Sequence, residues 1–503
     1  MLRKIRISLA AIIFTLITLL FLDFTGTFHT WLGWLTKIQL LPAILALNIG
    51  ILVFLVLLTL LLGRIYCSVI CPLGVFQDVV ARMGRRRKKF PYAFSPAKLW
   101  LRYGILVLFM AALLFGVSTV VALLDPYGVY GRITNNLFLP VWQWSNNLLA
   151  LIAERIDSYA FYQTDVWIKS LPTFIIAAVT FVVVVILAWR NGRTFCNTVC
   201  PVGTFLGILS RYTFFQIRID KQKCNQCSVC TRNCKSACIN HKEAKIDYTR
   251  CVACMNCIEK CDRHAIGYTF GFPKSGIVNS GKGQSFSEEN YACRRGFMMG
   301  AMIVSTSMLK AQVSKTTGNK MDWELADIAD KQRLRRQIPL TPAGSLSARN
   351  LKRHCTACQL CVTVCPNKVL YPSNSLETLM QPLMSYERGY CRPECVKCSE
   401  VCPSGAIHPI STEEKSSTQI GHAVWVRERC IPLTDKQSCD NCERHCPTKA
   451  ITMVSSVAGD ESSLKIPAIH EELCIGCGTC EYLCPSRPLS AIYVEGHPIH
   501  KII

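Results

Sequence analysis

Long apolar runs fill the first 190 residues of this chain, and a more polar, cysteine-rich sequence follows them. A helix needs roughly 20 apolar residues to cross the hydrocarbon core of a bilayer. Four runs reach that length: Ile5 to Phe24, Leu41 to Leu62, Leu99 to Leu124 and Leu171 to Trp189. The pattern predicts an α-helical membrane domain with four transmembrane helices, followed by soluble domains.

Basic residues predict the orientation of these helices. Arg3, Lys4 and Arg6 precede the first run, and the basic stretch 82–89 (RMGRRRKK) separates the second run from the third. Because positive residues favour the cytoplasmic side of a membrane, both stretches are expected in the cytoplasm. The formal net charge of +23 would also suit nucleic acid. We expect no nucleic-acid binding, because much of the excess lies beside apolar runs and cluster-bound thiolates would offset more of it.

The membrane part contains an internal repeat. The segments GRIYCSVICPLGVF (Gly63 to Phe76) and GRTFCNTVCPVGTF (Gly192 to Phe205) share the pattern C-x3-C-P and follow the second and fourth runs. Both copies are therefore expected at the cytoplasmic side, as parallel repeats would be. If the copies pack together, their thiols would meet at a metal centre or form a redox pair; the alternative is packed thiols at helix ends. These cysteines are Cys67, Cys71, Cys196 and Cys200.

The spacing of the other cysteines indicates iron–sulfur clusters. The repeated C-x2-C-x2-C-x3-C spacing is typical of ferredoxins, whereas zinc sites pair two C-x2-C units and disulfide frameworks show no such triplets. In a two-cluster ferredoxin the fourth cysteine of each run binds the other cluster. This rule assigns Cys224, Cys227, Cys230 and Cys261 to one [4Fe–4S] cluster, and Cys251, Cys254, Cys257 and Cys234 to a second. Lys235 stands where proline is usual, and Cys238 is expected to be a packed thiol.

Four further motifs occupy the C-terminal block, and each ends in Cys-Pro. Two have looser spacing, with three residues between Cys391 and Cys395 and eight between Cys430 and Cys439. Their sixteen cysteines suffice for four clusters, so the whole chain is expected to hold six [4Fe–4S] clusters in α+β ferredoxin-like domains.

The motifs resemble those of two families. Residues 1 to about 270, with apolar runs, C-x3-C-P motifs and a two-cluster block, resemble the NapH-type quinol dehydrogenase membrane subunits, whose motifs the NosR and CcoG proteins share. Residues from about 291 resemble the NapG-type four-cluster ferredoxins, so the chain looks like a fusion of two partner subunits. The resemblance implies a nested pairing of the C-terminal motifs, first with fourth and second with third. The implied ligand sets are Cys355, Cys358, Cys361 with Cys484; Cys474, Cys477, Cys480 with Cys365; Cys391, Cys395, Cys398 with Cys446; and Cys430, Cys439, Cys442 with Cys402.

A quinol site is expected in the membrane domain, because a four-helix membrane unit beside clusters suggests quinol as the electron source. Gln39, Asp125 and Arg132 are polar residues among apolar neighbours near the predicted outer boundary. Asp125 would accept a proton from the quinol. The alternative is that Asp125 caps a helix or pairs with Arg132.

The stretch CRRGFMMGAMIVSTSMLKAQ (Cys293 to Gln312) separates the two cysteine blocks. Arg294 and Arg295 followed by a weakly apolar run resemble a twin-arginine export motif. We expect a retained fifth crossing that leads to a periplasmic C-terminal domain; the alternative is a buried or amphipathic helix in a wholly cytoplasmic protein. The expected domains are residues 1–215 (membrane), 216–275 (cytoplasmic, two clusters), 276–320 (linker with the crossing) and 321–503 (four clusters).

The leading hypothesis for function is a quinol dehydrogenase of the bacterial inner membrane. It would oxidise menaquinol or ubiquinol and pass electrons to a periplasmic c-type cytochrome or reductase subunit, with a nitrate reductase system as the first candidate. One alternative, suggested by the NosR and CcoG resemblance, is a redox assembly factor for a metalloenzyme. Another is a ferredoxin-fed conduit for electrons across the membrane.

Overall fold

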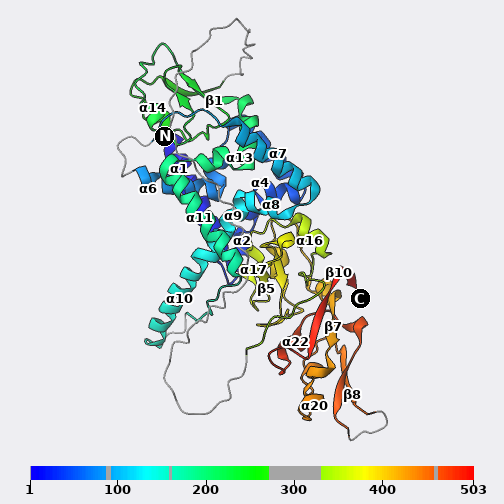
Figure 1. Cartoon of the computed structure of the whole chain (residues 1–503). Coiled ribbons are helices and arrows are strands. Elements are labelled where there is room, and N and C mark those ends of the chain that lie inside the picture. The colour runs from blue at the N-terminus through cyan, green and yellow to red at the C-terminus, as the bar shows by residue number, and fades with distance from the viewer. Residues whose placement is uncertain (1, 86–91, 158–160, 271–329, 458–462) are drawn as a thin grey trace, which may run out of the picture. The chain divides into compact units, whose positions relative to one another are not determined.

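The N-terminal part of the chain is helical in the computed structural model, which describes residues 2–85, 92–157, 161–270, 330–457 and 463–503 (Figure 1). Short segments of other helix types, η1 Tyr66–Ile70, η2 Thr134–Phe138 and η3 Ser210–Tyr212, join the α-helices. The α-helices of this part are α1 Leu2–Leu22, α2 Thr27–Leu32, α3 Trp34–Lys37, α4 Leu40–Leu45, α5 Ile49–Leu62, α6 Pro72–Arg85, α7 Leu99–Phe115, α8 Ser118–Leu124, α9 Pro126–Ile133, α10 Leu139–Glu154, α11 Leu171–Asn191, α12 Thr194–Thr198 and α13 Pro201–Leu209.

Two of the four predicted spans are single long helices. Among the described residues, α1 and α11 are long and apolar enough to cross a bilayer, and α5 and α7 are apolar but shorter. The run Leu41 to Leu62 is interrupted because Leu47 adopts a φ of 51° and Asn48 caps α5. The run Leu99 to Leu124 is interrupted at Gly116, whose φ of 71° ends α7. The prediction of four spanning helices is therefore unconfirmed for these two runs, because apolar composition alone does not reveal a backbone break.

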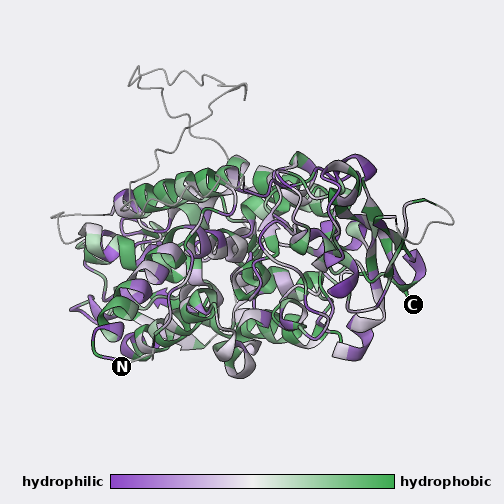
Figure 2. Cartoon of the chain, turned by 90° about the horizontal axis from the view of Figure 1, so that it is seen from below, coloured by the Kyte–Doolittle hydropathy of each residue, from purple (hydrophilic) through white to green (hydrophobic). Residues whose placement is uncertain are grey.

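Apolar side chains cover the outside of these helices. Leu57, Leu114 and Val179 are 52%, 82% and 57% exposed. The long helices are accordingly coloured mostly as hydrophobic in Figure 2. Apolar side chains that face outward over several helices are typical of a surface that meets lipid or another protein.

Helices also occupy the segments between the first and second runs and between the third and fourth runs. Helices α2 and α3 fall within residues 23–40, and α9, η2 and α10 follow one another within residues 125–170. Asp125 begins this second series, because its side chain accepts hydrogen bonds from the N–H groups of Tyr127 and Gly128 and Pro126 takes the first helical position.

The first cysteine block forms a small unit of paired strands and paired short helices. Strand β1 Phe215–Ile219 pairs antiparallel with β4 Ile266–Phe270, and β2 Ile239–Asn240 pairs with β3 Lys245–Ile246. The short helices α14 Val229–Arg232 and α15 Asn256–Glu259 contact each other.

The C-terminal block contains two such units in succession. In the first, β5 Leu370–Pro372 pairs with β6 Pro382–Met384, and α17 Leu360–Val364 contacts α18 Lys397–Glu400. In the second, β8 Ile451–Ser455 pairs with β9 Lys465–Ile469, and α21 Asn441–Arg444 contacts α22 Thr479–Leu483. The long strands β7 Thr418–Trp425 and β10 Ile492–Ile502 also pair antiparallel. The other elements are α16 Ala348–His354, α19 Thr412–Ser416, α20 Ile431–Thr434, η4 Leu376–Thr378, η5 Arg427–Arg429 and η6 Glu471–Leu473.

The two cysteine blocks contact opposite ends of α1 and α11. At the start of α1, Arg3 Nε donates to Asn256 Oδ1 of the first block at 3.0 Å, and beyond its end Lys397 Nζ donates to Thr25 O at 3.0 Å. Helix α11 begins beside the C-terminal block, where Ser170 Oγ donates to the Asn374 side chain at 2.6 Å. It ends beside the first block, where the N–H of Arg193 donates to Lys235 O at 2.9 Å. The length of the apolar helices therefore separates the two blocks.

Candidate functional site

Each of the four regular cysteine motifs forms the same type of backbone loop. The residues that precede the second cysteine and follow it adopt positive φ, and only one of the four loops uses glycine for this. Non-glycine residues in the left-handed region cost energy and occur mainly where function requires them. In the loop that begins at Cys355, the conformation directs the Ala357 N–H to Cys355 Sγ at 3.4 Å. The left-handed pairs are Gln226 and Ser228, Ala253 and Met255, Ala357 and Gln359, and Gly476 and Gly478.

In the first block, the structure brings Cys234 to the Cys251, Cys254 and Cys257 motif, as the two-cluster rule predicts. Cys238 lies in the same group, because its Sγ is 3.5 Å from Cys234 Sγ and its side chain also bonds with Cys251. This site therefore has five thiols within reach. Cys224, Cys227 and Cys230 lie together, and Cys261 packs against the same small core as Cys230.

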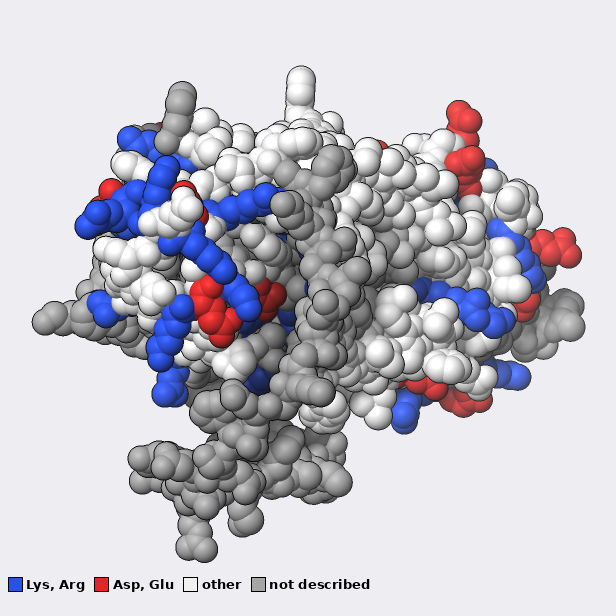
Figure 3. Space-filling model, turned by 90° about the horizontal axis from the view of Figure 1, so that it is seen from above, with Lys and Arg blue, Asp and Glu red and all other residues white. Residues whose placement is uncertain are grey.

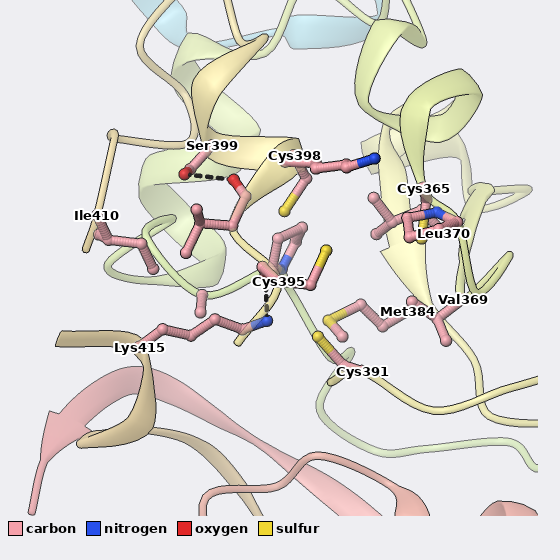
Figure 4. Close-up of a pocket in the computed structure, with 15 residues that line it drawn as sticks. Cys365, Val369, Leu370, Met384, Cys391, Cys395, Cys398, Ser399, Ile410 and Lys415 are labelled. Carbon is pink, nitrogen blue, oxygen red and sulfur yellow. Dashed lines mark hydrogen bonds between the residues drawn. The ribbon is translucent and has the colours of Figure 1, made fainter. Parts of the chain in front are cut away.

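In the C-terminal block, the structure groups the cysteines of neighbouring motifs. Cys365 lines a small pocket with Cys391, Cys395 and Cys398 (Figure 4). Cys484 lines a second small pocket with Cys430, Cys439 and Cys442. The remaining groups are Cys402 beside Cys355, Cys358 and Cys361, and Cys446 beside Cys474, Cys477 and Cys480.

This grouping corrects the nested pairing that the resemblance implied, in which Cys355, Cys358 and Cys361 went with Cys484, and Cys391, Cys395 and Cys398 with Cys446. The physical reason is local. The paired helices α17 with α18, and α21 with α22, fold the first motif onto the second and the third onto the fourth. In each unit, the fourth cysteine of one motif therefore joins the first three cysteines of the other motif.

The cysteine groups suit clusters better than single ions. In the part of the chain that the structure describes, no three Cys, His, Asp or Glu side chains stand close enough to hold one metal ion. Backbone N–H groups also point at several of these thiols, as they do at the sulfur ligands of clusters. For example, Ala491 N–H donates to Cys484 Sγ at 3.3 Å.

Lys415 is a residue of these sites that the sequence did not reveal. Its buried ammonium donates to Arg392 O at 2.6 Å and to Cys395 O, and it lies beside the Cys391 thiol. A buried cation next to thiolate ligands stabilises the reduced form of a cluster. No local signal marks this lysine, since it lies thirteen residues beyond the motif that ends at Cys402.

The two C-x3-C-P motifs meet, as their repeat suggested. Cys67, Cys71, Cys196 and Cys200 are all buried, with exposed fractions of 3 to 4%. The thiols of both copies influence one another electrostatically. Burial raises the pKa of the Cys196 thiol to about 11, so this thiol is neutral near pH 7 unless a bound metal displaces its proton. We call these four residues the four-thiol site.

The arginine of each copy donates a hydrogen bond to the backbone of the other copy. Arg64 of the first copy donates to Cys196 O of the second at 3.4 Å, and Arg193 of the second donates to Cys67 O of the first at 2.7 Å. Glycine allows this close packing, since a Cβ on Gly74 would lie 2.3 Å from Cys67 O and a Cβ on Gly203 would lie 2.4 Å from Cys196 O. The shared motif residues thus hold the two copies against each other.

An acidic residue ties the four-thiol site to its surroundings. Asp78 on α6 accepts hydrogen bonds from Arg193 Nε at 2.6 Å and Nη2 at 2.7 Å, and it also pairs with Lys235 of the first block. Arg6 of α1 approaches the same carboxylate at 3.5 Å. Although burial acts to raise it, Arg193 and Lys235 hold the pKa of Asp78 well below its usual value.

The three candidate quinol-site residues are buried, and two of them lie together. Gly128 is close to both the Asp125 carboxylate and the Arg132 guanidinium, and Arg132 Nη1 donates to Ala357 O at 3.4 Å. Burial raises the pKa of Asp125 to about 6. The capping role foreseen as an alternative for Asp125 is present, because its Oδ2 accepts the Gly128 N–H at 2.7 Å. Gln39 accepts a hydrogen bond from Tyr66 Oη at 2.9 Å.

Two tyrosines connect these residues to the cysteine sites. Tyr66 is fully buried and lies close enough to Cys67, Cys71 and Asp125 to be affected by their charges. Tyr127 likewise lies close enough to Asp125 and to the Cys358 and Cys402 thiols to be affected by their charges. The aromatic position before Cys67 in the repeat was the sequence signal for Tyr66. Tyr127 stands, with Asp125 and Arg132, among the polar residues near the predicted outer boundary.

Family models match both kinds of cysteine motif. A "4Fe-4S binding domain" model matches residues 45–91 and 172–222, which contain the four-thiol site. A "4Fe-4S dicluster domain" model matches residues 437–487, which contain the second C-terminal unit apart from Cys430. That match agrees with pairing the third motif with the fourth.

Curated relatives are iron–sulfur and electron-transport proteins. The chain is 30% identical over 164 residues to a methylamine utilization ferredoxin-type protein MauM of Methylophilus methylotrophus, which covers 31% of this chain and 71% of that protein. It is 30% identical over 173 residues to the ferredoxin-type protein NapG of Haemophilus influenzae, covering 32% of this chain and 60% of NapG. It is 24% identical over 227 residues to the putative electron transport protein YccM of Escherichia coli, covering 44% of this chain and 55% of YccM. The chain thus spans only part of each relative, and no solved structure matches it.

Proposed function

Because the chain belongs to the family of MauM-type ferredoxin proteins and is an iron–sulfur electron-transfer protein, we propose that it is a membrane-bound quinol dehydrogenase. In this proposal the apolar helices cross the bilayer, the first block lies in the cytoplasm and the C-terminal block in the periplasm. The twin-arginine stretch 293–312, which would lead the chain outward, lies outside the described residues.

The contact between Asp125, Arg132 and the Cys355 loop carries this proposal. Arg132 bonds to the backbone of the loop between Cys355 and Cys358, and Tyr127 lies beside the Cys358 and Cys402 thiols. A quinol bound at Asp125 would therefore meet the first cluster site of the C-terminal block directly.

Quinol oxidation releases two electrons and two protons. Asp125 is placed to take a proton, because its pKa of about 6 leaves the carboxylate ionised at neutral pH yet able to accept one. The Cys355 group and the three groups beyond it would supply one-electron carriers, so the two electrons leave singly. The six predicted [4Fe–4S] clusters belong to this proposal.

The membrane placement is supported by two observations. The blocks contact opposite ends of α1 and α11, whose length and composition suit a bilayer. One face of the molecule is also white, without Lys, Arg, Asp or Glu, over most of the described surface at its middle (Figure 3). We propose that the chain crosses the membrane four times in this part, twice through helices with a backbone break. We also propose a periplasmic c-type cytochrome or reductase, such as a nitrate reductase, as the partner that accepts the electrons.

The test is reduction by quinol. The anaerobically purified chain would be mixed with a short-chain menaquinol, and electron paramagnetic resonance would count the reduced clusters. We expect reduction in the wild-type protein and slow reduction in Asp125→Asn, with Asp165→Asn, an exposed acid paired with Lys368, as the control. Reduction by reduced ferredoxin but not by quinol would instead favour the electron-conduit alternative.

A further inference from the structure

The four-thiol site has no role in the ferredoxin-type assignments. Its cysteines come in pairs from the two C-x3-C-P copies and lie at the junction between α6, α12, α13 and η1. They are the only cysteines within residues 45–91 and 172–222, where the 4Fe-4S binding family model matches.

We propose that Cys67, Cys71, Cys196 and Cys200 together hold one further [4Fe–4S] cluster, two ligands from each repeat. Four buried thiols from two chain segments form the donor set that such a cluster requires. Among the residues that the structure describes, no three Cys, His, Asp or Glu side chains are placed to share one metal ion, these thiols included. The cluster would be a seventh centre beyond the six ferredoxin-type ones.

The charges around the site support an anionic occupant. Arg64 is fully buried, and its partners are the neutral groups Asn197 Oδ1, Thr249 O and Cys196 O, together with the Cys67 thiol at 3.8 Å. A buried guanidinium whose partners are neutral is costly. A cluster with four thiolates carries about two negative charges and would offset that cost.

Hydrogen-bond donors already point at the sulfur atoms. Gln77 Nε2 donates to Cys196 Sγ at 3.3 Å, and the Gly203 N–H donates to Cys200 Sγ at 3.3 Å. Such bonds to cluster ligands raise the reduction potential. Gln77 has no equivalent in the second copy, where the corresponding residue of the repeat is Leu206. Leucine is therefore compatible with this position of the repeat.

The site lies between the two cysteine blocks. Arg64 reaches Thr249 of the first block and is near Cys251, while Tyr66 is near Cys67, Cys71 and Asp125 on the other side. This position would make the site a one-electron relay, in which an electron arrives and leaves without any bond or proton change. The relay role rests on the proposed function, whereas the presence of the cluster does not.

The experiment counts iron and acid-labile sulfide per chain after anaerobic purification. Cys67→Ser with Cys196→Ser should contain about four fewer irons and four fewer sulfides than the wild-type chain. The matched control is Val69→Ala with Val199→Ala, which trims side chains within the same two motifs but keeps every thiol. The control should keep the full iron content.

A second variant avoids any loss of folding. Gln77→Leu removes the hydrogen bond to Cys196 and copies the second repeat, so it should keep all iron and lower the midpoint potential of one cluster in an electron paramagnetic resonance titration. Equal iron and sulfide in the wild-type and cysteine-variant chains would overturn the proposal. So would one zinc ion or a disulfide at these cysteines, or unchanged potentials in Gln77→Leu. Failure of quinol oxidation would not alter these counts, so the two proposals fail separately.

Discussion

Replacing Asp78 by asparagine should loosen the junction between the two repeats. Asp78 receives two hydrogen bonds from Arg193, which is fully buried, and pairs with Lys235. Removing one partner of a buried ion pair costs about 3 to 5 kcal/mol because the other charge stays buried. Asparagine keeps one acceptor oxygen, so we expect the lower end, about 3 kcal/mol, which is a factor of roughly 100 in the local opening equilibrium.

Native-state hydrogen exchange measures that opening. Peptides covering residues 72–85 and 193–209 should exchange roughly 100-fold faster in Asp78→Asn, whereas peptides of the C-terminal block should not change. Asp440→Asn is the control, because Asp440 is exposed and its pair with Arg444 lies on the surface. Unchanged exchange at residues 72–85 would refute the view that Asp78 holds the repeats together. Because the pKa of Asp78 is held low, its stabilising effect is present at neutral pH and is lost only as the pH falls below the usual range of a carboxyl group.

Three further predictions concern the quinol site, the repeat and the cysteine pairing. Asp125→Asn should slow reduction of the clusters by menaquinol about 100-fold. In stopped-flow absorbance, the wild-type rate should rise as the pH increases through about 6, where Asp125 loses its proton. An identical pH profile in the variant would exclude Asp125 as the base. Gly203→Ala should lower the melting temperature, because its Cβ would lie 2.4 Å from a backbone carbonyl oxygen, whereas Gly104→Ala, which meets no atom within 4 Å, should not. Cys365→Ser combined with Cys398→Ser should lose no more iron than either single change if both bind one cluster; loss of about eight irons would restore the nested pairing.

The spacing of the cysteines predicted the local structure well. Each C-x2-C-x2-C motif with regular spacing has one type of loop, and the two C-x3-C-P copies meet, as their repeat suggested. The rule for two-cluster ferredoxins also predicted that Cys234 of the first motif joins the cysteines of the second motif in the first block.

The failures concern features that the local sequence pattern does not show. The nested pairing came from a resemblance, while the observed pairing depends on which short helices contact each other, as α17 does with α18. The breaks at Leu47 and Gly116 lie inside apolar runs, where hydropathy does not show backbone angles. Asp78 and Lys415 went unnoticed because their partners lie more than twenty residues away or in another domain.

Electron transfer in proteoliposomes would show whether electrons from quinol leave through the C-terminal block. The chain would be inserted in one orientation into vesicles that contain menaquinol, and a one-electron dye that cannot cross the bilayer would be added on one side at a time. We expect dye reduction only on the side that exposes the C-terminal block, and a loss of that reduction in Cys402→Ser. Reduction that appears only on the side of the first block, or that requires no quinol, would contradict the proposed function.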